Sequence, residues 1–375
     1  MHYLDNAATT RVLPEAAEAA VRTMCEGFGN PSSLHRLGIE ASHLLENSRR
    51  TVAASLGCLP EETYFTSCGT ESTGISLHGA AHLHRHKKGR VITTAIEHAA
   101  TRNTCKQLAA EGFDVVFLAP DETGHVTPEA LEDALTADTI LLTCQLVNSE
   151  IGTMQPVDVL GARLKAKAPG ALFHIDAVQG LCRVPLEPKK WQCDLMSVSG
   201  HKIGAPKGVG ALYIRKGLRL PPLLTGGGQE KGIRPGTEPL PNIAAFAKAC
   251  EIRMAHFDED NARVSALSTY LRTQVAEKLP DAVWNGRSDV PHVVNLSIPG
   301  CKSEVMLRVL EGDEVYVSSG SACSKGRQSE VLRALGLSKA RTDSALRISF
   351  APSNTKEDVD AFIAAVLKGI KMLRR

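Results

Sequence analysis

The chain has 375 residues, of which 43% are hydrophobic and 22% charged, and its 43 Lys and Arg against 41 Asp and Glu leave a formal charge of +2. This length suffices for about two domains with a substantial core, so the fold does not depend on disulfide bonds. The balance excludes a disordered chain and gives no support to DNA binding or membrane binding through bulk charge.

Short apolar runs, each followed by a polar and often Gly-containing segment, recur through the first two thirds of the chain. They lie at residues 91–93, 115–118, 140–143, 172–175, 195–198 and 210–214. Such continuous apolarity predicts strands that are buried on both faces. Helical stretches such as 128–135 intervene, which indicates an α/β fold with a mostly parallel sheet. Ligands bind at the carboxyl ends of the strands in such sheets, so the residues just after each run are site candidates.

The last third has a different pattern. We expect a helix over 256–279, a strand over 293–298, and a closing helix over 354–373 whose apolar stripe follows an Asn354/Thr355 cap. These elements predict a smaller α+β domain that begins near residue 256.

Ten cysteines are scattered along the chain with no C-x-x-C pair, which argues against a zinc or iron–sulfur cage built from local pairs. The chain opens without a basic region and apolar stretch, and no run of 18 apolar residues occurs. We therefore expect a cytoplasmic protein that does not enter membranes, with most of its cysteines packed as small hydrophobes. The histidine-rich run 82–90 is interpreted as a solvated basic turn, because a spacing of two at a helix end scatters the imidazoles; no metal site is predicted.

Lys202 lies just past a predicted buried strand, in a glycine-rich turn that begins Ser199-Gly200-His201. A desolvated amine there could act as a Schiff-base lysine, although a lysine in such a loop is usually solvated. Asp176 ends the preceding apolar run, and a buried carboxylate needs a cationic partner. Lysine plus aspartate is the pairing expected for pyridoxal phosphate.

A strand, a turn of small residues and a helix start are predicted over Tyr64 to Ser72, and this arrangement can hold an anion through backbone N–H groups. The Thr70 and Ser199 hydroxyls and the His201 ring could add donors, although Thr70 taken by itself is better explained as a plain helix N-cap. No dinucleotide or P-loop motif occurs.

Three further polar residues are candidates by position. His98 and Asn148 follow apolar runs, where a capping or turn role is the alternative. Arg347 interrupts an apolar strand-like segment, and its guanidinium needs a carboxylate, either from a substrate or from a structural Asp or Glu. Cys323 differs from the other cysteines because small residues, Lys325 and Arg327 surround it, which predicts an exposed loop and a favoured thiolate.

Taken together, these motifs resemble the cysteine desulfurases of the class V aminotransferase group over essentially the whole chain. The resemblance is carried by YLDNAATT (3–10), GNP (29–31), FTSCGTES (65–72), EH (97–98), VNSEIG (147–152), HIDAVQ (174–179), SVSGHK (197–202), GGGQEKGIRPGT (226–237) and SSGSAC (318–323). It implies an aspartate aminotransferase-like fold (fold type I of the pyridoxal-phosphate enzymes). A large domain would span 16–255, and a small domain would comprise 1–15 and 256–375.

The resemblance also implies residue roles. Lys202 would form the Schiff base with pyridoxal 5'-phosphate, Asp176 would pair with the ring nitrogen, Gln179 would bond the ring hydroxyl, and His98 would stack on the ring and assist proton transfer. Arg347 and Asn148 would bind the substrate carboxylate, and Cys323 would accept sulfur. The residues expected around the phosphate are Gly69, Thr70, Ser199, His201 and, from the second subunit of a homodimer, Thr237.

The implied reaction converts L-cysteine to L-alanine and leaves a persulfide on the enzyme, for delivery to an acceptor protein in iron–sulfur cluster assembly, thio-cofactor synthesis or tRNA thiolation. A selenocysteine lyase or another C–S lyase on the same scaffold is the nearest alternative. A catalytically silent sulfur-relay protein is an alternative of another class, against which Lys202 and Asp176 argue.

Overall fold

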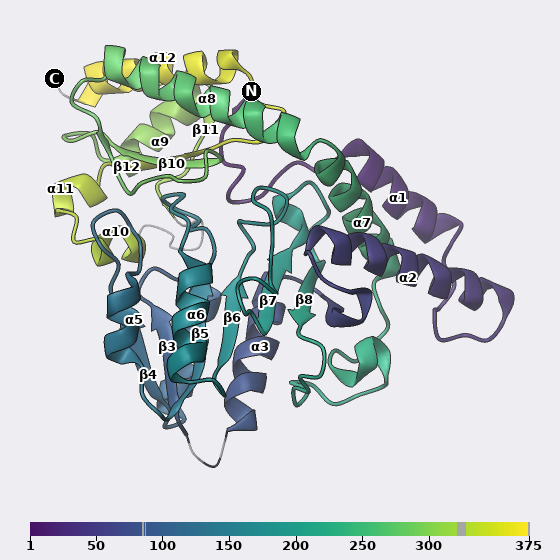
Figure 1. Ribbon diagram of the computed structural model, residues 1–375. Coiled ribbons are helices and arrows are strands. Elements are labelled where there is room, and N and C mark those ends of the chain that lie inside the picture. Colours follow the sequence, from purple (N-terminus) through teal and green to yellow (C-terminus); the bar gives the residue numbers. More distant parts are fainter. Residues whose placement is uncertain (85, 87, 321–327, 374–375) are drawn as a thin grey trace.

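The computed structural model describes residues 1–84, 86, 88–320 and 328–373, and its ribbon is shown in Figure 1. The strands are β1 (His2–Tyr3), β2 (Thr63–Thr66), β3 (Arg90–Thr94), β4 (Asp114–Leu118), β5 (Thr139–Gln145), β6 (Leu172–Asp176), β7 (Leu195–Ser199), β8 (Gly210–Ile214), β9 (Val283–Trp284), β10 (Val293–Ser297), β11 (Val315–Tyr316) and β12 (Ala345–Ser349). All six apolar runs predicted as strands between residues 90 and 214 are confirmed.

Helices connect most of these strands. They are α1 (Pro14–Cys25), α2 (Arg36–Ser55), α3 (Gly69–Leu83), α4 (Ala99–Ala110), α5 (Pro128–Ala134), α6 (Val157–Lys167), α7 (Leu240–Ala255), α8 (Phe257–Lys278), α9 (Ser303–Gly312), α10 (Glu330–Ala334), α11 (Lys339–Thr342) and α12 (Lys356–Leu373). The helices predicted near 128–135, 256–279 and 354–373 are confirmed as α5, α8 and α12. Within the described residues, no helix is long and apolar enough to span a bilayer.

The main sheet has seven strands in the order β2-β8-β7-β6-β5-β3-β4. β8 runs antiparallel to both of its neighbours, and all other adjacent pairs are parallel. The prediction of a mostly parallel sheet is therefore confirmed. The register aligns Asp176 at the end of β6 with Gln145 on β5 and Ser197 on β7, so the polar residues that follow these strands meet at one edge of the sheet.

Both faces of this sheet are covered by helices, which explains the apolar runs. Successive residues of β7 pack into the apolar layers on opposite faces of the sheet: Leu195 packs with residues of α3 and α4, whereas Met196 packs with residues of α1, α2, α6 and α7. Because side chains alternate between the two faces of a strand, a strand between two helix layers must be apolar at nearly every position.

A second core lies in the last third of the chain. It joins Leu4 to apolar residues between 264 and 366, contributed by α8, α9, α12, β10 and β12. β10 pairs antiparallel with β9 and β12, while β1 pairs in parallel with β11. In Figure 1 this group lies above the main sheet and contains both the N-terminus and α12.

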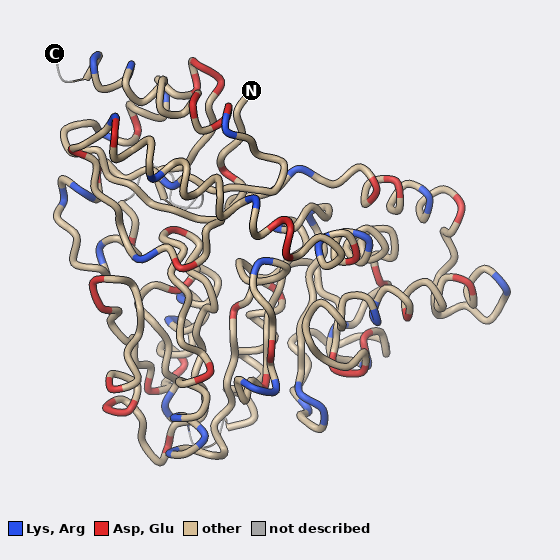
Figure 2. Tube along the Cα trace, turned by 45° about the horizontal axis from the view of Figure 1, so that its top comes forward, with Lys and Arg blue, Asp and Glu red and all other residues tan. Residues whose placement is uncertain are grey.

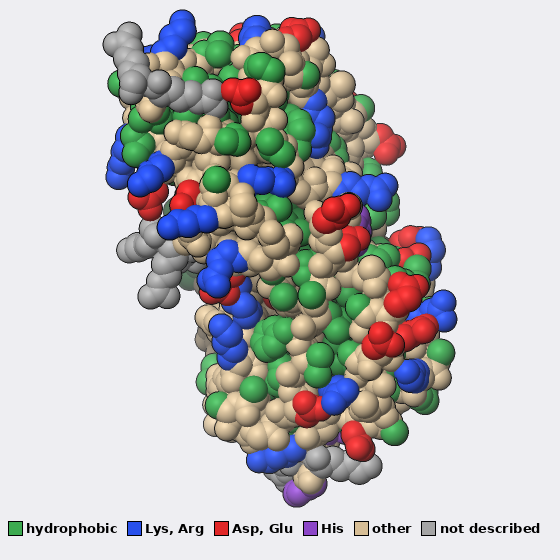
Figure 3. All heavy atoms as spheres, turned by 90° about the vertical axis from the view of Figure 1, so that its left-hand side faces the viewer, with side chains coloured by type: hydrophobic (Ala, Val, Ile, Leu, Met, Phe, Trp, Pro, Cys, Tyr) green, Lys and Arg blue, Asp and Glu red, His purple; other side chains and the backbone are tan. Residues whose placement is uncertain are grey.

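The molecular surface carries charges of both signs. Figure 2 shows Lys and Arg interspersed with Asp and Glu along the whole trace, and on the face in Figure 3 hydrophobic side chains lie between charged groups of both signs. This distribution agrees with the small formal charge of +2.

Candidate active site

A cavity of about 230 Å³ lies where the N-terminal segment, β12 and the turns after several strands of the main sheet meet. Most of the predicted site residues line it, namely Gly69, Thr70, His98, Asp176, Gln179, Ser199, His201, Lys202 and Arg347. Segments from both cores thus converge on one chamber, which we treat as the candidate active site.

Lys202 lies in the 3₁₀ turn Gly200–Lys202 that follows β7. Its Nζ donates hydrogen bonds to the backbone oxygens of Ala7 at 2.7 Å and Ala8 at 2.8 Å. Burial, reinforced by the positive charges of Arg183 and Arg347, lowers the pKa of Lys202 to about 7. A substantial fraction of the amine is therefore neutral and nucleophilic near neutral pH.

Asp176 ends β6, lines the cavity and is only 7% exposed. Its Oδ1 accepts a hydrogen bond from the Val178 backbone N–H at 3.0 Å. Burial raises the pKa of Asp176, while His98 and Lys202 act in the opposite direction. A buried carboxyl with one backbone donor is incompletely satisfied, so a cationic or N–H group in the cavity would stabilise its charged form.

The strand, turn and helix start that were predicted to cradle an anion are found at β2 and α3. The turn after Thr66 leads into the helix at Gly69, where an added Cβ would lie 2.6 Å from Val178 Cγ2, so only glycine fits. Ser199 Oγ is buried without a hydrogen-bond partner among the described residues. Such an orphaned hydroxyl beside a helix N-terminus favours an external acceptor, for which a phosphate oxygen is suitable.

His201 and His98 are both held in neutral form by their surroundings. His201 Nδ1 lies 3.1 Å from Thr9 Oγ1, and burial, followed by the charge of Lys202, lowers its pKa to about 4. His98 caps α4 by accepting a hydrogen bond from the Ala100 N–H at 3.1 Å. Burial of the His98 ring lowers its pKa. His98 therefore caps α4 and also lines the cavity.

Arg347 lies on β12 and is 2% exposed. Its Nη2 donates to Asp5 Oδ1 at 2.7 Å and its Nη1 to the Ser149 backbone oxygen at 3.0 Å, whereas its Nε has no partner in the described part of the chain. Asp5 is thus the structural carboxylate that the sequence analysis considered for Arg347. The Nε donor of the same guanidinium is left for a ligand.

Two predicted site residues do not line the cavity. The Asn148 side chain is used locally: it donates to the Ile96 backbone oxygen at 3.0 Å and accepts from the Glu150 and Ile151 N–H groups. Its role here is that of a turn residue, the alternative that the sequence also allowed. Thr237 is exposed and is not among the residues that line this cavity.

Gln179 lines the cavity, but its side chain is already engaged. Its Nε2 donates to the Ala7 backbone oxygen at 3.0 Å, and its Oε1 accepts from Arg183 Nη1. Arg183 also donates to the Lys202 backbone oxygen at 3.2 Å. Gln179 therefore joins the N-terminal segment to the turn that holds Lys202.

Sequence reasoning missed several residues of the site. The backbone oxygens of Ala7 and Ala8 bind the Lys202 amine, Asp5 binds Arg347, and Arg183 lies behind Gln179. Glu97 is also buried, and its Oε2 has no partner among the described residues. The YLDNAATT and EH motifs contain most of these positions, but small apolar residues that act through their backbone leave no signal in side-chain chemistry.

The cysteines divide less simply than predicted. Six of the nine described cysteines are buried, as expected, but Cys25 is exposed and Cys58 and Cys68 are partly accessible. Cys68 lines the cavity, so it is not merely a packing residue. Cys323, predicted as the reactive cysteine, lies outside the described residues.

Comparison with known proteins finds relatives along the whole chain. Residues 2–362 match the class-V aminotransferase family. The cysteine desulfurase IscS of Methanosarcina thermophila is 40% identical over 376 residues, covering 99% of this chain and 92% of the relative.

Solved structures agree with this result. A NifS-like protein superposes with a TM-score of 0.93 at 36% identity and covers 99% of both chains. SspA, solved in complex with cysteine, superposes with a TM-score of 0.84 at 32% identity, covering 95% of this chain and 100% of that chain. These matches confirm the predicted α/β fold of the aspartate aminotransferase type.

Proposed function

This chain belongs to the class-V aminotransferase family, and from that premise we propose that it is a pyridoxal-phosphate-dependent cysteine desulfurase in which Lys202 and Asp176 hold the cofactor. Full-length relatives carry the name cysteine desulfurase, and the similar SspA was solved with cysteine. One observation supports these residue roles: one cavity contains the Lys202 amine, the buried Asp176 carboxyl and the unpartnered Ser199 hydroxyl.

The residues of the cavity fit pyridoxal 5'-phosphate. Lys202 supplies an amine of lowered pKa for the covalent link, and Asp176 supplies a buried carboxyl for the ring nitrogen. Ser199 Oγ, the Gly69 end of α3 and Thr70 offer hydrogen-bond donors for the phosphate. A neutral His201 can donate one ring N–H without adding charge.

When bound, pyridoxal phosphate acts as an electron sink for the substrate carbon that loses its proton. The protein residues perform the remaining tasks. Lys202, whose pKa is lowered to about 7, would hold the cofactor through its amine, and the neutral amine would serve as the base for the α-proton of cysteine. Positioned proton transfer contributes about 10²–10⁴-fold to a rate.

His98 is the second group suited to proton transfer. It lines the cavity, and burial lowers its pKa, so the imidazole is held in the neutral form. Nδ1 accepts the hydrogen bond from the Ala100 N–H, so the ring proton lies on Nε2, which can donate it to the substrate.

Arg347 is positioned to bind the substrate α-carboxylate. Its Nε is buried without a partner, while Asp5 and the Ser149 carbonyl fix the other two nitrogens. A carboxylate that accepts from this guanidinium would align cysteine with its Cα near Lys202. Asn148 supports this arrangement indirectly, through the turn that carries Ser149.

In the sulfur-transfer step, the Cys323 thiolate attacks the sulfur of the substrate and the C–S bond breaks. The sulfur stays on Cys323 as a persulfide, and the substrate carbon takes a proton to give L-alanine. The basic neighbours Lys325 and Arg327 favour the thiolate. A second thiol that accepts the outer sulfur then regenerates the enzyme.

We extend the proposal to the assembly and its setting. The enzyme acts as a homodimer in which Thr237 of the partner subunit reaches the phosphate; within its own chain Thr237 is exposed and does not line the cavity. A cytoplasmic acceptor protein for iron–sulfur cluster assembly, thio-cofactor synthesis or tRNA thiolation receives the sulfur. The two hydrophobic cores support the division into a large domain (16–255) and a small domain (1–15 and 256–375).

The test compares L-cysteine with L-selenocysteine as substrates of the purified holoenzyme, with alanine release as the readout. A desulfurase releases alanine from cysteine and forms one persulfide per chain. Turnover of selenocysteine alone would identify a selenocysteine lyase, and no alanine from either substrate would indicate a silent relay protein.

A further inference from the structure

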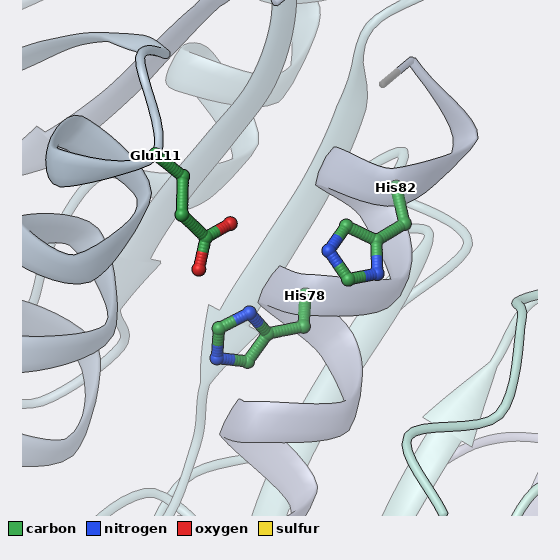
Figure 4. A group of neighbouring side chains, drawn as sticks. All are labelled: His78, His82 and Glu111. Carbon is green, nitrogen blue, oxygen red and sulfur yellow. The ribbon is translucent and has the colours of Figure 1, made fainter.

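Two histidines and a glutamate come together at the end of α3 that is remote from the active site. His78 and His82 lie one turn apart near the C-terminus of α3, and Glu111 follows the last residue of α4. Figure 4 shows both imidazoles on one side of α3, with the Glu111 carboxylate directed toward them. One ligand atom from each of the three side chains lies within 4.8 Å of the others.

The position in the fold explains this proximity. Residues four apart on a helix share a face, and α3 and α4 pack side by side with Leu77, Ala81 and Leu108 in a common core. His78 lies nine residues beyond Gly69, about 13 Å along the axis at about 1.5 Å per residue. The cluster is therefore separate from the cavity that holds Lys202.

Two imidazoles and one carboxylate form a donor set that binds zinc and similar divalent ions. The ring centroids of His78 and His82 are 6.0 Å apart. Bonds of about 2.1 Å to one tetrahedral ion would bring the ligand atoms to roughly 3.4 Å from one another. Side-chain rotation can bring the ligand atoms this much closer, because His82 is exposed and His78 and Glu111 are at least partly accessible.

The local electrostatics also favour a cation. The carbonyl end of α3, where His78 and His82 lie, carries partial negative charge. Lys88 Nζ donates to the Glu111 backbone oxygen at 2.6 Å, and Gln107 Nε2 donates to Glu111 Oε1 at 3.1 Å. Among the described residues, no lysine or arginine forms an ion pair with the Glu111 carboxylate, which is available to a metal.

We propose that His78, His82 and Glu111 bind a zinc-type divalent metal ion, with water completing the coordination. The donor set and the geometry of the three side chains carry this assignment, which is independent of the proposed desulfurase activity. The sequence predicts no metal site when only the histidines from residue 82 onward are considered. The histidine that lies beside His82 is His78, one helical turn earlier and outside that run.

Such an ion would join the C-terminal ends of α3 and α4. The opposite ends of these helices carry Gly69 and His98, both of which line the active-site cavity. A ligand that binds only the folded state raises its stability with concentration, so we expect metal to raise the melting temperature of the protein.

The test titrates Co²⁺ into chelator-treated holoenzyme and records the visible d–d bands, followed by displacement with Zn²⁺. Thiolate ligands would add a charge-transfer band, so the spectrum separates this cluster from the cysteines. We expect one ion per chain without that band, and at least about tenfold weaker binding after His82→Ala or His78→Ala. The matched control is His43→Ala, an exposed histidine on α2.

Thermal unfolding provides the second readout. Zn²⁺ should raise the melting temperature of the wild type and of the His43→Ala variant, but not of the His82→Ala and Glu111→Gln variants. Equal Co²⁺ affinity in wild type and His82→Ala, a thiolate band, or no binding at millimolar Co²⁺ would overturn the proposal.

Discussion

Arg347 on β12 donates from Nη2 to Asp5 Oδ1 at 2.7 Å, across 342 positions of the sequence. The segment that follows β1 is thereby fixed against the second core, while its Ala7 and Ala8 carbonyls bind the Lys202 amine. The N-terminal segment thus connects the group proposed to bind the substrate carboxylate with the group proposed to hold the cofactor.

Asp5→Asn should weaken substrate binding more than turnover. Without the carboxylate, Arg347 loses its charged partner and its orientation, at a cost of about 1.5–3 kcal/mol for a hydrogen bond between charged groups. We expect KM for cysteine to rise about tenfold or more in steady-state alanine release, with a smaller change in kcat. Asp358→Asn is the matched control, because Asp358 pairs with His2 of the same segment at 2.8 Å but does not line the cavity. Equal KM values in the two variants would remove Asp5 from the positioning of Arg347.

Lys202→Ala should abolish the covalent link to the cofactor. Lys202 is the lysine that lines the cavity in the described part of the chain, and its lowered pKa of about 7 favours the neutral amine. Borohydride reduction followed by peptide mass mapping should find the cofactor on Lys202 in the wild type and on no lysine in the variant. Lys207→Ala, an exposed lysine five residues later, should retain the link. A reduced adduct on another lysine in Lys202→Ala would move the Schiff base elsewhere.

Ser199→Ala should weaken cofactor binding without destabilising the apoprotein. Ser199 Oγ has no protein partner among the described residues, so its removal costs the fold little, whereas a hydrogen bond to a phosphate contributes about 1.5–3 kcal/mol. We expect the dissociation constant of pyridoxal phosphate, measured by absorbance titration, to rise about tenfold or more.

Ser197→Ala is the opposite control, since Ser197 Oγ lies 2.8 Å from the buried His174 Nε2. That variant should lower the stability of the apoprotein in urea and leave cofactor affinity nearly unchanged. The assignment of Ser199 to the phosphate fails if both variants bind the cofactor equally well.

Cys323→Ala should keep the cofactor spectrum and lose the enzyme persulfide, because the transferred sulfur has no thiolate to receive it. Persulfide is measured by alkylation and mass spectrometry after one turnover with cysteine. Cys68→Ala is the informative comparison, since Cys68 also lines the cavity. Persulfide that persists in Cys323→Ala and disappears in Cys68→Ala would assign the acceptor role to Cys68.

Sequence reasoning located the strands and most site residues because both leave direct signals. A strand between two helix layers is apolar throughout, as β7 is, and Lys202 and Asp176 stand out as charges at the ends of such runs. The contacts of Ala7 and Ala8 were beyond this reasoning, since backbone carbonyls act independently of side-chain type. The sequence could not assign Asn148, because an asparagine after a strand can stabilise a turn or bind a ligand. The three local hydrogen bonds show the turn role, and a ligand role stays a prediction.

Glu97→Gln should change how stability depends on pH. Burial raises the pKa of Glu97 to about 8 from its ordinary 4.5, against hydrogen bonds from Thr94 and Gln145 that lower it. Between these two values the folded state holds a proton that the unfolded state has released, so the free energy of unfolding falls as pH rises. The slope from this one group is at most about 1.4 kcal/mol per pH unit.

Glutamine keeps an oxygen for Thr94 and Gln145 and removes the titration. Urea unfolding of the apoprotein between pH 5 and pH 9 should therefore show a smaller loss of stability with rising pH in Glu97→Gln than in the wild type, and a more stable variant at the alkaline end. Glu187→Gln, which changes an exposed carboxylate paired with Lys190, should follow the wild-type curve. Parallel curves for wild type and Glu97→Gln would mean that Glu97 is already ionised in the folded protein, and that its negative charge, not a neutral carboxyl, lies behind His98.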